Sequence, residues 1–307
     1  MSKPSILVTG ATGRHGGTGI RIVEILRSQG FFVKAMVRRK DERSLLLEKM
    51  GAEVVEADFH NYPSLAQALA GVKQAYFCYP VASGIVEATT NFAAVGRESG
   101  LEYVVNNSMG ASHPVSPSPL ARAQWMSEQI LTWAGFDCVH LRGGFFFENI
   151  LLFSEQSIIT QGRIANSFGD NSITWLAAED MAQVSAKLLS TKNTSFGSVV
   201  PITANERIPL AEVVRIFSSV LGKPIQFENL EFDEWRKHLR ENPRINPEMI
   251  EHLIGLAKLI QRQNAMPLVN TVEQITGKQP ILLAEFVQKH RERLLNKIAQ
   301  VNLATFE

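Results

Sequence analysis

The chain has 307 residues, of which 45% are hydrophobic and 20% charged, and its 31 lysines and arginines against 30 aspartates and glutamates give a net charge of +1. This balance provides no electrostatic attraction for nucleic acid or for an anionic membrane, so neither is expected as a partner. The apolar runs are too short for a transmembrane helix, and the first residues lack the pattern of a secretory signal. The two cysteines, Cys78 and Cys138, lie in strand-like runs, and we expect them to be reduced thiols in the core. We therefore expect a cytoplasmic protein.

Short apolar runs alternate with helix-length segments through the first half of the chain. Strands that are apolar on both faces are predicted at residues 5–9, 32–37, 53–57, 74–79, 102–106 and 138–141, with a seventh at 198–203. Helices are predicted between them at residues 19–29, 41–50, 64–69, 86–98 and 121–133. Because parallel neighbours need crossover helices, the alternation predicts an α/β fold with a Rossmann-type, doubly wound parallel sheet.

After about residue 205 the pattern becomes mostly helical. Helices are predicted at residues 210–221, 233–240, 247–263 and 281–298. This predicts a Rossmann domain over residues 1–204 and a smaller C-terminal lobe over residues 205–307 that binds substrate, with residues 143–172 contributing in part to the cleft. Ligands of doubly wound folds bind at the carboxyl edge of the sheet, and we expect the lobe to lie over that edge.

A glycine-rich turn connects the first strand to the first helix. It comprises Gly10, Ala11, Thr12 and Gly13. Gly10 permits the tight turn, Gly13 lets a pyrophosphate approach the backbone, and N–H groups at the start of the helix bind phosphate oxygens. The turn therefore predicts a site for NAD(P), with Thr12 among its contacts.

The rest of the turn is irregular. Arg14, His15 and Gly16 extend it as a longer phosphate loop, in which His15 is either a phosphate contact or an exposed loop histidine. Gly16 and Gly19 are both candidates for the third glycine. Gly19 is favoured, because it shares a helical face with Ile22 that should pack on the sheet.

The second strand ends at Arg38 and Arg39, where an NAD-binding protein has a carboxylate for the ribose 2′-hydroxyl. Arginines at this position suit the 2′-phosphate of NADP, which makes NADP(H) the preferred cofactor and NAD(H) the alternative. The alternative is that both arginines are solvated charges on the surface, without a role in binding. Two pairs after the next strands complete the predicted cofactor site: Asp58 and Phe59 at the adenine, and Tyr79 and Pro80 beside the ribose and nicotinamide.

Further motifs follow in a characteristic order. They are Val105-Asn106-Asn107-Ser108, Glu128, Gly135, Leu141-Arg142, Phe146-Phe147-Glu148-Asn149, Trp175 with Glu179-Asp180-Met181-Ala182, and residues 275–280. Together with the glycine turn, they resemble the NmrA-like family of atypical short-chain dehydrogenase/reductases over nearly the whole chain. The resemblance implies binding of NAD(P)(H), usually NADPH. It also implies one of two roles, a reductase of compounds such as quinones and azo compounds, or a redox sensor that acts through a regulatory protein partner.

Two departures bear on the chemistry. None of the four tyrosines has a lysine four residues later, so the Tyr-x-x-x-Lys pair of classical members is absent. Gln124 stands four residues before Glu128, where many NmrA-like members keep lysine, and Gly143 replaces the expected proline. A neutral glutamine can only form hydrogen bonds. Gln124 and Ser108 are therefore the candidate catalytic residues, in positioning roles, while Asn107 and Gly143 join the predicted cofactor site.

The substrate pocket is assigned to four residues near the sheet edge that suit a flat ring: Trp125, Gly144, Phe145 and Phe147. We also expect Gly143 and Gly144 to widen the space beside the nicotinamide.

The seven histidines make no metal-ligand spacing, so no metal site is expected. The favoured hypothesis is a reductase that transfers hydride to an aromatic or quinone-like small molecule. The second is a non-catalytic dinucleotide sensor.

Overall fold

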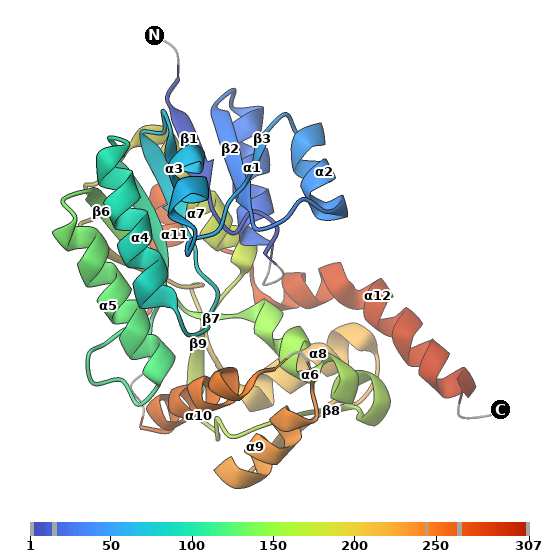
Figure 1. Cartoon of the computed structure of the whole chain (residues 1–307). Coiled ribbons are helices and arrows are strands. Elements are labelled where there is room, and N and C mark those ends of the chain that lie inside the picture. Colours follow the sequence, from blue (N-terminus) through green and yellow to red (C-terminus); the bar gives the residue numbers. More distant parts are fainter. Residues whose placement is uncertain (1–2, 14–16, 244, 263–265, 305–307) are drawn as a thin grey trace.

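The computed structural model describes residues 3–13, 17–243, 245–262 and 266–304, with side chains up to residue 300. A seven-stranded sheet, in which all neighbours are parallel, forms its centre (Figure 1). In spatial order the strands are β10 (Val199–Ile202), β6 (Asp137–Gly143), β5 (Tyr103–Met109), β4 (Gln74–Phe77), β1 (Ser5–Val8), β2 (Phe32–Val37) and β3 (Glu53–Glu56). The predicted Rossmann-type architecture is confirmed.

Helices cover both faces of this sheet. Successive side chains of a strand point to opposite faces, so Ile6 and Val8 enter one core and Leu7 enters the other. The first core also takes residues from α1 (Thr18–Ser28), α2 (Glu42–Lys49), α7 (Ala178–Thr191) and α11 (Thr271–Thr276). The second takes residues from α3 (Tyr62–Leu69), α4 (Ile85–Glu98) and α5 (Pro119–Trp133). The carboxyl ends of the strands thus form one edge between two helical layers.

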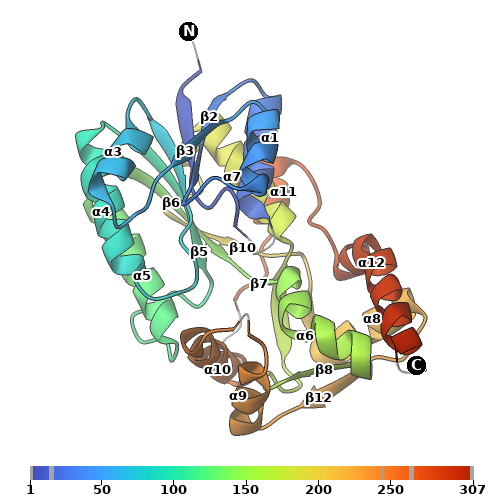
Figure 2. The ribbon, with the colours of Figure 1, turned by 45° about the vertical axis from the view of Figure 1, so that its right-hand side comes forward.

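The smaller part of the molecule lies beyond that edge (Figure 2). It contains the four predicted C-terminal helices, α8 (Leu210–Leu221), α9 (Phe232–Arg240), α10 (Pro247–Gln261) and α12 (Leu283–Ala304). Its core is built around large buried side chains that include Phe217 and Trp235. None of the described helices is both long and apolar enough to cross a membrane.

Several elements between residues 143 and 229 were not predicted. They are β7 (Phe145–Phe146), α6 (Phe147–Gln161), β8 (Arg163–Asn166), β9 (Ser172–Leu176), β11 (Arg207–Pro209) and β12 (Gln226–Asn229), together with α7. β9 pairs with β7 and β11, and β8 pairs with β12. The core of the smaller part therefore takes residues from before and after residue 204, among them Phe147 and Trp175.

Candidate active site

The glycine turn holds β1 and α1 in close contact. Gly10 has φ +65°, and its carbonyl oxygen accepts a hydrogen bond from the N–H of Gly13 at 2.9 Å. A Cβ atom at Gly19 would lie 2.4 Å from the Gly10 carbonyl oxygen and 2.8 Å from Cα of Ala11, so only glycine fits there. Gly19 thus packs α1 on the turn. Three residues of the predicted phosphate loop lie outside the described residues: Arg14, His15 and Gly16.

The first turn of α1 offers backbone donors. Its N-cap is Gly17 at φ +68°, where no side chain accepts from the helix, and its first turn has no acidic residue. The first N–H groups of a helix have no partner inside the helix, and the helix dipole favours an anion beside them. Gly10, Gly13, Thr18 and Gly19 line a cavity at this helix end. This arrangement fits the pyrophosphate of a dinucleotide.

Three arginines lie at the end of β2 and on the segment after it. Arg38 and Arg39 are exposed, and Arg43 donates from Nη1 to the carbonyl oxygen of Thr12 at 2.8 Å. Arg43 also forms an ion pair with Asp41, the residue that caps α2. The sequence analysis placed Arg43 in a helix but missed its role, because the contact with Thr12 joins positions far apart in the chain. Arg43 thus brings a cation to the glycine turn.

The predicted adenine residues lie beside Tyr79. Asp58 Oδ1 accepts the N–H of His60 at 2.9 Å, and the Phe59 ring lies 5.7 Å from the Tyr79 ring, centroid to centroid. Burial, and then the charge of Asp58, raises the pKa of the Tyr79 hydroxyl. Tyr79 and Pro80 line the cavity, whereas the side chains of Asp58 and Phe59 lie outside its lining, as do those of Arg38 and Arg39.

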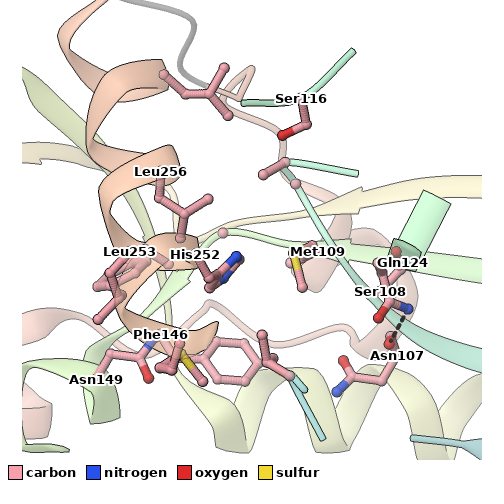
Figure 3. A pocket seen from close by; sticks show the side chains of 18 of the residues that line it. Asn107, Ser108, Met109, Ser116, Gln124, Phe146, Asn149, His252, Leu253 and Leu256 are labelled. Atoms are coloured by element: carbon pink, nitrogen blue, oxygen red, sulfur yellow. Dashed lines mark hydrogen bonds between the residues drawn. The ribbon is translucent and has the colours of Figure 1, made fainter. Parts of the chain in front are cut away.

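The cavity has a volume of about 810 Å³ and extends from the glycine turn to α10. It brings together Asn107 and Ser108 at the end of β5, Gln124 on α5, and Gly143 at the end of β6 (Figure 3). Gln124 is buried and donates from Nε2 to the carbonyl oxygen of Asn107 at 3.3 Å. The candidate nicotinamide residues from three elements therefore share one wall.

Gly143 and Gly144 do not widen this cavity, contrary to the expectation from sequence. A Cβ atom at Gly143 would lie 2.8 Å from Cε of Met181, and one at Gly144 would lie 2.7 Å from the carbonyl oxygen of Thr174. The space that their missing side chains leave is thus occupied by α7 and β9. The two glycines permit close packing of the chain behind the cavity.

A buried ion pair supports Ser108. The Ser108 hydroxyl donates to Glu128 Oε1 at 2.5 Å, and Arg142 donates to both carboxylate oxygens, from Nε at 2.9 Å and from Nη2 at 2.5 Å. Glu128 is fully buried. A hydroxyl has one proton, and Ser108 uses it on Glu128, so Ser112, whose Oγ lies 3.0 Å away, donates to Ser108 and leaves it one lone pair for the cavity. This geometry gives no support for Ser108 as a nucleophile or a proton donor.

The predicted substrate residues separate into two groups. Gly144 and Phe145 line the cavity. Phe147 is fully buried in the core of the smaller part, where its ring stacks on Trp175 at 5.9 Å, and Trp125 is not in the cavity lining. Phe146 and Phe153, which the sequence marks as aromatic residues near the sheet edge, also line it, whereas other apolar residues of the wall were missed, among them Leu152, Met249, Leu253 and Leu256.

His252 was also missed. It lies on α10, is buried, lines the cavity, and its Nδ1 lies 2.7 Å from Ser118 Oγ. Nothing in the local sequence marks it, because its position depends on how α10 docks on α5.

In the described part of the chain, no group of three or more histidine, cysteine, aspartate or glutamate side chains could hold a metal ion.

Comparison with protein families and curated sequences gives relatives over nearly the whole chain. The model of the NmrA-like family matches residues 2–288. The chain is 24% identical to an NAD(P)H azoreductase of Xenophilus azovorans over 286 residues, which cover 93% of this chain and 97% of the relative.

Solved structures share the fold. An NADPH-dependent quinone oxidoreductase of Escherichia coli, solved with NADPH, superposes with a TM-score of 0.79 at 21% identity, covering 92% of this chain and 99% of that one. A negative transcriptional regulator, NmrA, solved with NADP, superposes with a TM-score of 0.78 at 15% identity, covering 96% of this chain and 98% of that one.

Proposed function

The chain belongs to the NmrA-like family, and from this premise we propose that it is an NAD(P)H-dependent reductase of flat, electron-poor acceptors such as quinones. The observation that carries the proposal is the continuous cavity of about 810 Å³, which joins the glycine turn to an apolar wall. Among the described residues, no carboxylate lines it, and Arg262, the one lysine or arginine of the lining, is exposed. A pocket of this kind favours an uncharged ring beside the nicotinamide.

The cofactor half of the site supports a proposal on how the dinucleotide binds and which form is preferred. When bound, NADPH supplies the hydride. We assign the pyrophosphate to the glycine turn and the first turn of α1, and the 2′-phosphate to Arg38, Arg39 and Arg43. Arginine binds phosphate through charge-assisted hydrogen bonds, so we propose a preference for NADPH, with NADH as the weaker alternative.

The nicotinamide half positions the ring without acid–base chemistry. Asn107, Ser108 and Gln124 lie where the ring would enter, and Ser108 offers a lone pair that can accept from the carboxamide. Burial raises the pKa of Tyr79, which therefore stays protonated at neutral pH. A quinone accepts hydride without an enzymic acid, and its reduced form takes its proton from water.

The comparisons support a reductase at the level of class. Two of the proteins reported above are named for the reduction of azo compounds and of quinones. One is named a transcriptional regulator, and a sensor without chemistry is therefore the alternative that an experiment must separate.

NADPH oxidation by the purified full-length protein, measured against a panel of quinones, azo dyes and aromatic ketones, tests the proposal. We expect turnover with flat, uncharged acceptors. The matched control is Gly13→Val, in which a bulky side chain blocks the approach of pyrophosphate to the backbone, so that cofactor binding and turnover are lost together. Tight NADPH binding without turnover across the whole panel would contradict the reductase and favour the sensor.

A further inference from the structure

His252 presents an imidazole to the apolar half of the cavity. Its ring projects from α10 toward the end of β5, where Ser108 and Met109 lie (Figure 3). Nδ1 lies 2.7 Å from Ser118 Oγ, and Nε2 has no hydrogen-bond partner within the described residues. Nδ1 is therefore engaged, and Nε2 is the polar atom that the ring can offer to a ligand.

Ser118 determines which nitrogen carries the proton. Ser118 is the N-cap of α5, and its Oγ accepts the N–H of Ala121 at 3.1 Å. The side chain is fully buried, so its hydroxyl proton also needs an acceptor. The only other partner of this hydroxyl in the described chain is Nδ1 of His252. Ser118 therefore donates to Nδ1, and the neutral imidazole carries its proton on Nε2.

The docking of α10 on α5 fixes this arrangement. A Cβ atom at Gly255 would lie 2.8 Å from Cα of Ser118, so the two helices meet at backbone distance. Burial lowers the pKa of His252 to about 4, and the ring is therefore uncharged at neutral pH. The other residues of α10 that line the cavity are all apolar: Met249, Leu253, Leu256, Leu259 and Ile260. Among the side chains by which α10 lines the cavity, His252 is thus the one with an N–H donor, and it stands in an otherwise apolar helix face.

We propose that His252 Nε2–H is the specificity-determining donor of the substrate pocket, and that it selects aromatic acceptors with a carbonyl oxygen. This inference rests on the proposed function. When hydride from NADPH adds to the acceptor with its electron pair, negative charge develops on the carbonyl oxygen, and a preorganised donor stabilises that charge. A neutral imidazole does not give up its Nε2 proton under these conditions, so water supplies the proton that completes the reduction.

The test is a binding measurement that does not depend on turnover. 9-Fluorenone and fluorene have the same flat ring system, and only fluorenone has a carbonyl oxygen. We expect the full-length protein, saturated with NADP⁺, to bind fluorenone about fivefold to tenfold more tightly than fluorene, as one neutral hydrogen bond predicts. In His252→Asn the shorter amide still accepts from Ser118 but lacks an atom at Nε2. We expect fluorene affinity and the melting temperature to be retained and the preference for fluorenone to be lost.

His113 provides the matched control. It is an exposed histidine in the cavity lining, and its Nδ1 accepts the N–H of Val115 at 3.3 Å. His113→Asn removes the same ring from the same cavity, and we expect it to keep the preference for fluorenone. Equal binding of the two probes by the parent protein, or an unchanged preference in His252→Asn, would overturn the proposal.

A spectroscopic readout covers the case in which His252→Asn does not fold. In the parent protein labelled with ¹⁵N-histidine, we expect the His252 resonances at neutral pH to show a protonated Nε2 and an unprotonated Nδ1. The opposite tautomer would contradict the assignment. Selective fluorenone binding by a protein that oxidises no NADPH would leave the His252 donor intact and refute the proposed reductase. Turnover without that selectivity would refute only the donor.

Discussion

Single residues at the glycine turn decide what the sheet edge can bind. Gly19 was expected from its helical face to pack on the sheet, and the 2.4 Å separation between a Cβ at that position and the Gly10 carbonyl oxygen explains why glycine is required. The turn and the helix after it were readable from sequence because local backbone geometry demands glycine there. Arg43 and His252 were not, because their roles depend on neighbours far away in the chain.

Cofactor choice gives the first prediction. Arg38→Glu replaces a cation that we assign to the 2′-phosphate with a carboxylate that repels it. We expect NADPH affinity to fall by about 10-fold to 100-fold, as the loss of one charge-assisted contact predicts, with NADH affinity little changed. Fluorescence titration of both cofactors measures this. Arg215→Glu, at an exposed arginine on α8, is the control. Equal affinities for NADH and NADPH in the parent would contradict the assignment.

Gln124 provides the second prediction. Within the described part of the chain, its side chain makes one hydrogen bond, to the carbonyl oxygen of Asn107 at 3.3 Å, and it is neutral and without acid–base capacity. We expect Gln124→Ala to reduce kcat by about threefold to tenfold at unchanged cofactor affinity. Steady-state NADPH oxidation, with cofactor binding measured separately, checks this. A loss of about 100-fold or more would instead mark Gln124 as part of an acid–base mechanism.

Among the helices and strands, the buried strands of the central sheet were predicted better than the short strands of the smaller part. The strands of the central sheet are apolar on both faces and are separated by helices that end in glycine, so their pattern is strong. The short strands β8, β9 and β12 pair across long intervals of sequence, and propensity alone does not identify such pairs. α7 was missed for a related reason, because it packs against α1 and α11, which lie far from it in the chain.

Asp180, near the start of α7, carries a prediction on pH. Its buried carboxylate accepts the N–H of Ile281 at 2.9 Å. Burial raises its pKa from 3.8 to about 7, and Glu179, Glu148 and Glu285 act in the same direction, whereas the bond from Ile281 opposes the shift. The folded chain therefore binds a proton that the unfolded chain releases above about pH 4. The contribution of Asp180 to the free energy of unfolding is therefore fully present below about pH 4. It decreases as the pH rises and is lost by the time the pH passes about 7.

Asp180→Asn tests this assignment, because asparagine keeps an acceptor for Ile281 and cannot ionise. We expect the variant to be more stable than the parent at pH 8, by about 1–3 kcal/mol, and to lack the fall in stability between pH 5 and 8. Urea unfolding across this range gives both quantities. The same pH profile in both proteins would show that Asp180 does not titrate in that window.

At the scale of the whole molecule, the cavity forms where the sheet edge meets the smaller part. The sequence predicted this meeting from the general position of ligands in doubly wound folds, but not which side chains of α10 enter the cavity. The core of the smaller part combines residues of α6 and β9 with residues of α8, α10 and α12. The boundary predicted after residue 204 therefore divides a continuous core, although all seven strands of the main sheet precede it.

A truncated chain ending at residue 204 tests this view of the core. We expect it to expose the apolar faces of α6 and β9, to bind a hydrophobic dye, and to aggregate. Size-exclusion chromatography and dye fluorescence measure these properties beside the full chain. A monomeric fragment with cooperative unfolding and no dye binding would show that residues 1–204 form an independent domain.

The central claim is that this chain transfers hydride from NADPH to an acceptor held in the cavity. Single-turnover mixing of the NADPH-loaded protein with a quinone, using cofactor deuterated on one or the other face of C4, tests it most directly. We predict rapid oxidation of bound NADPH that slows with deuterium on one face only, because a fixed cavity presents one face to the acceptor. Bound NADPH that persists unoxidised, or that is oxidised at the rate of the free cofactor, would contradict the account.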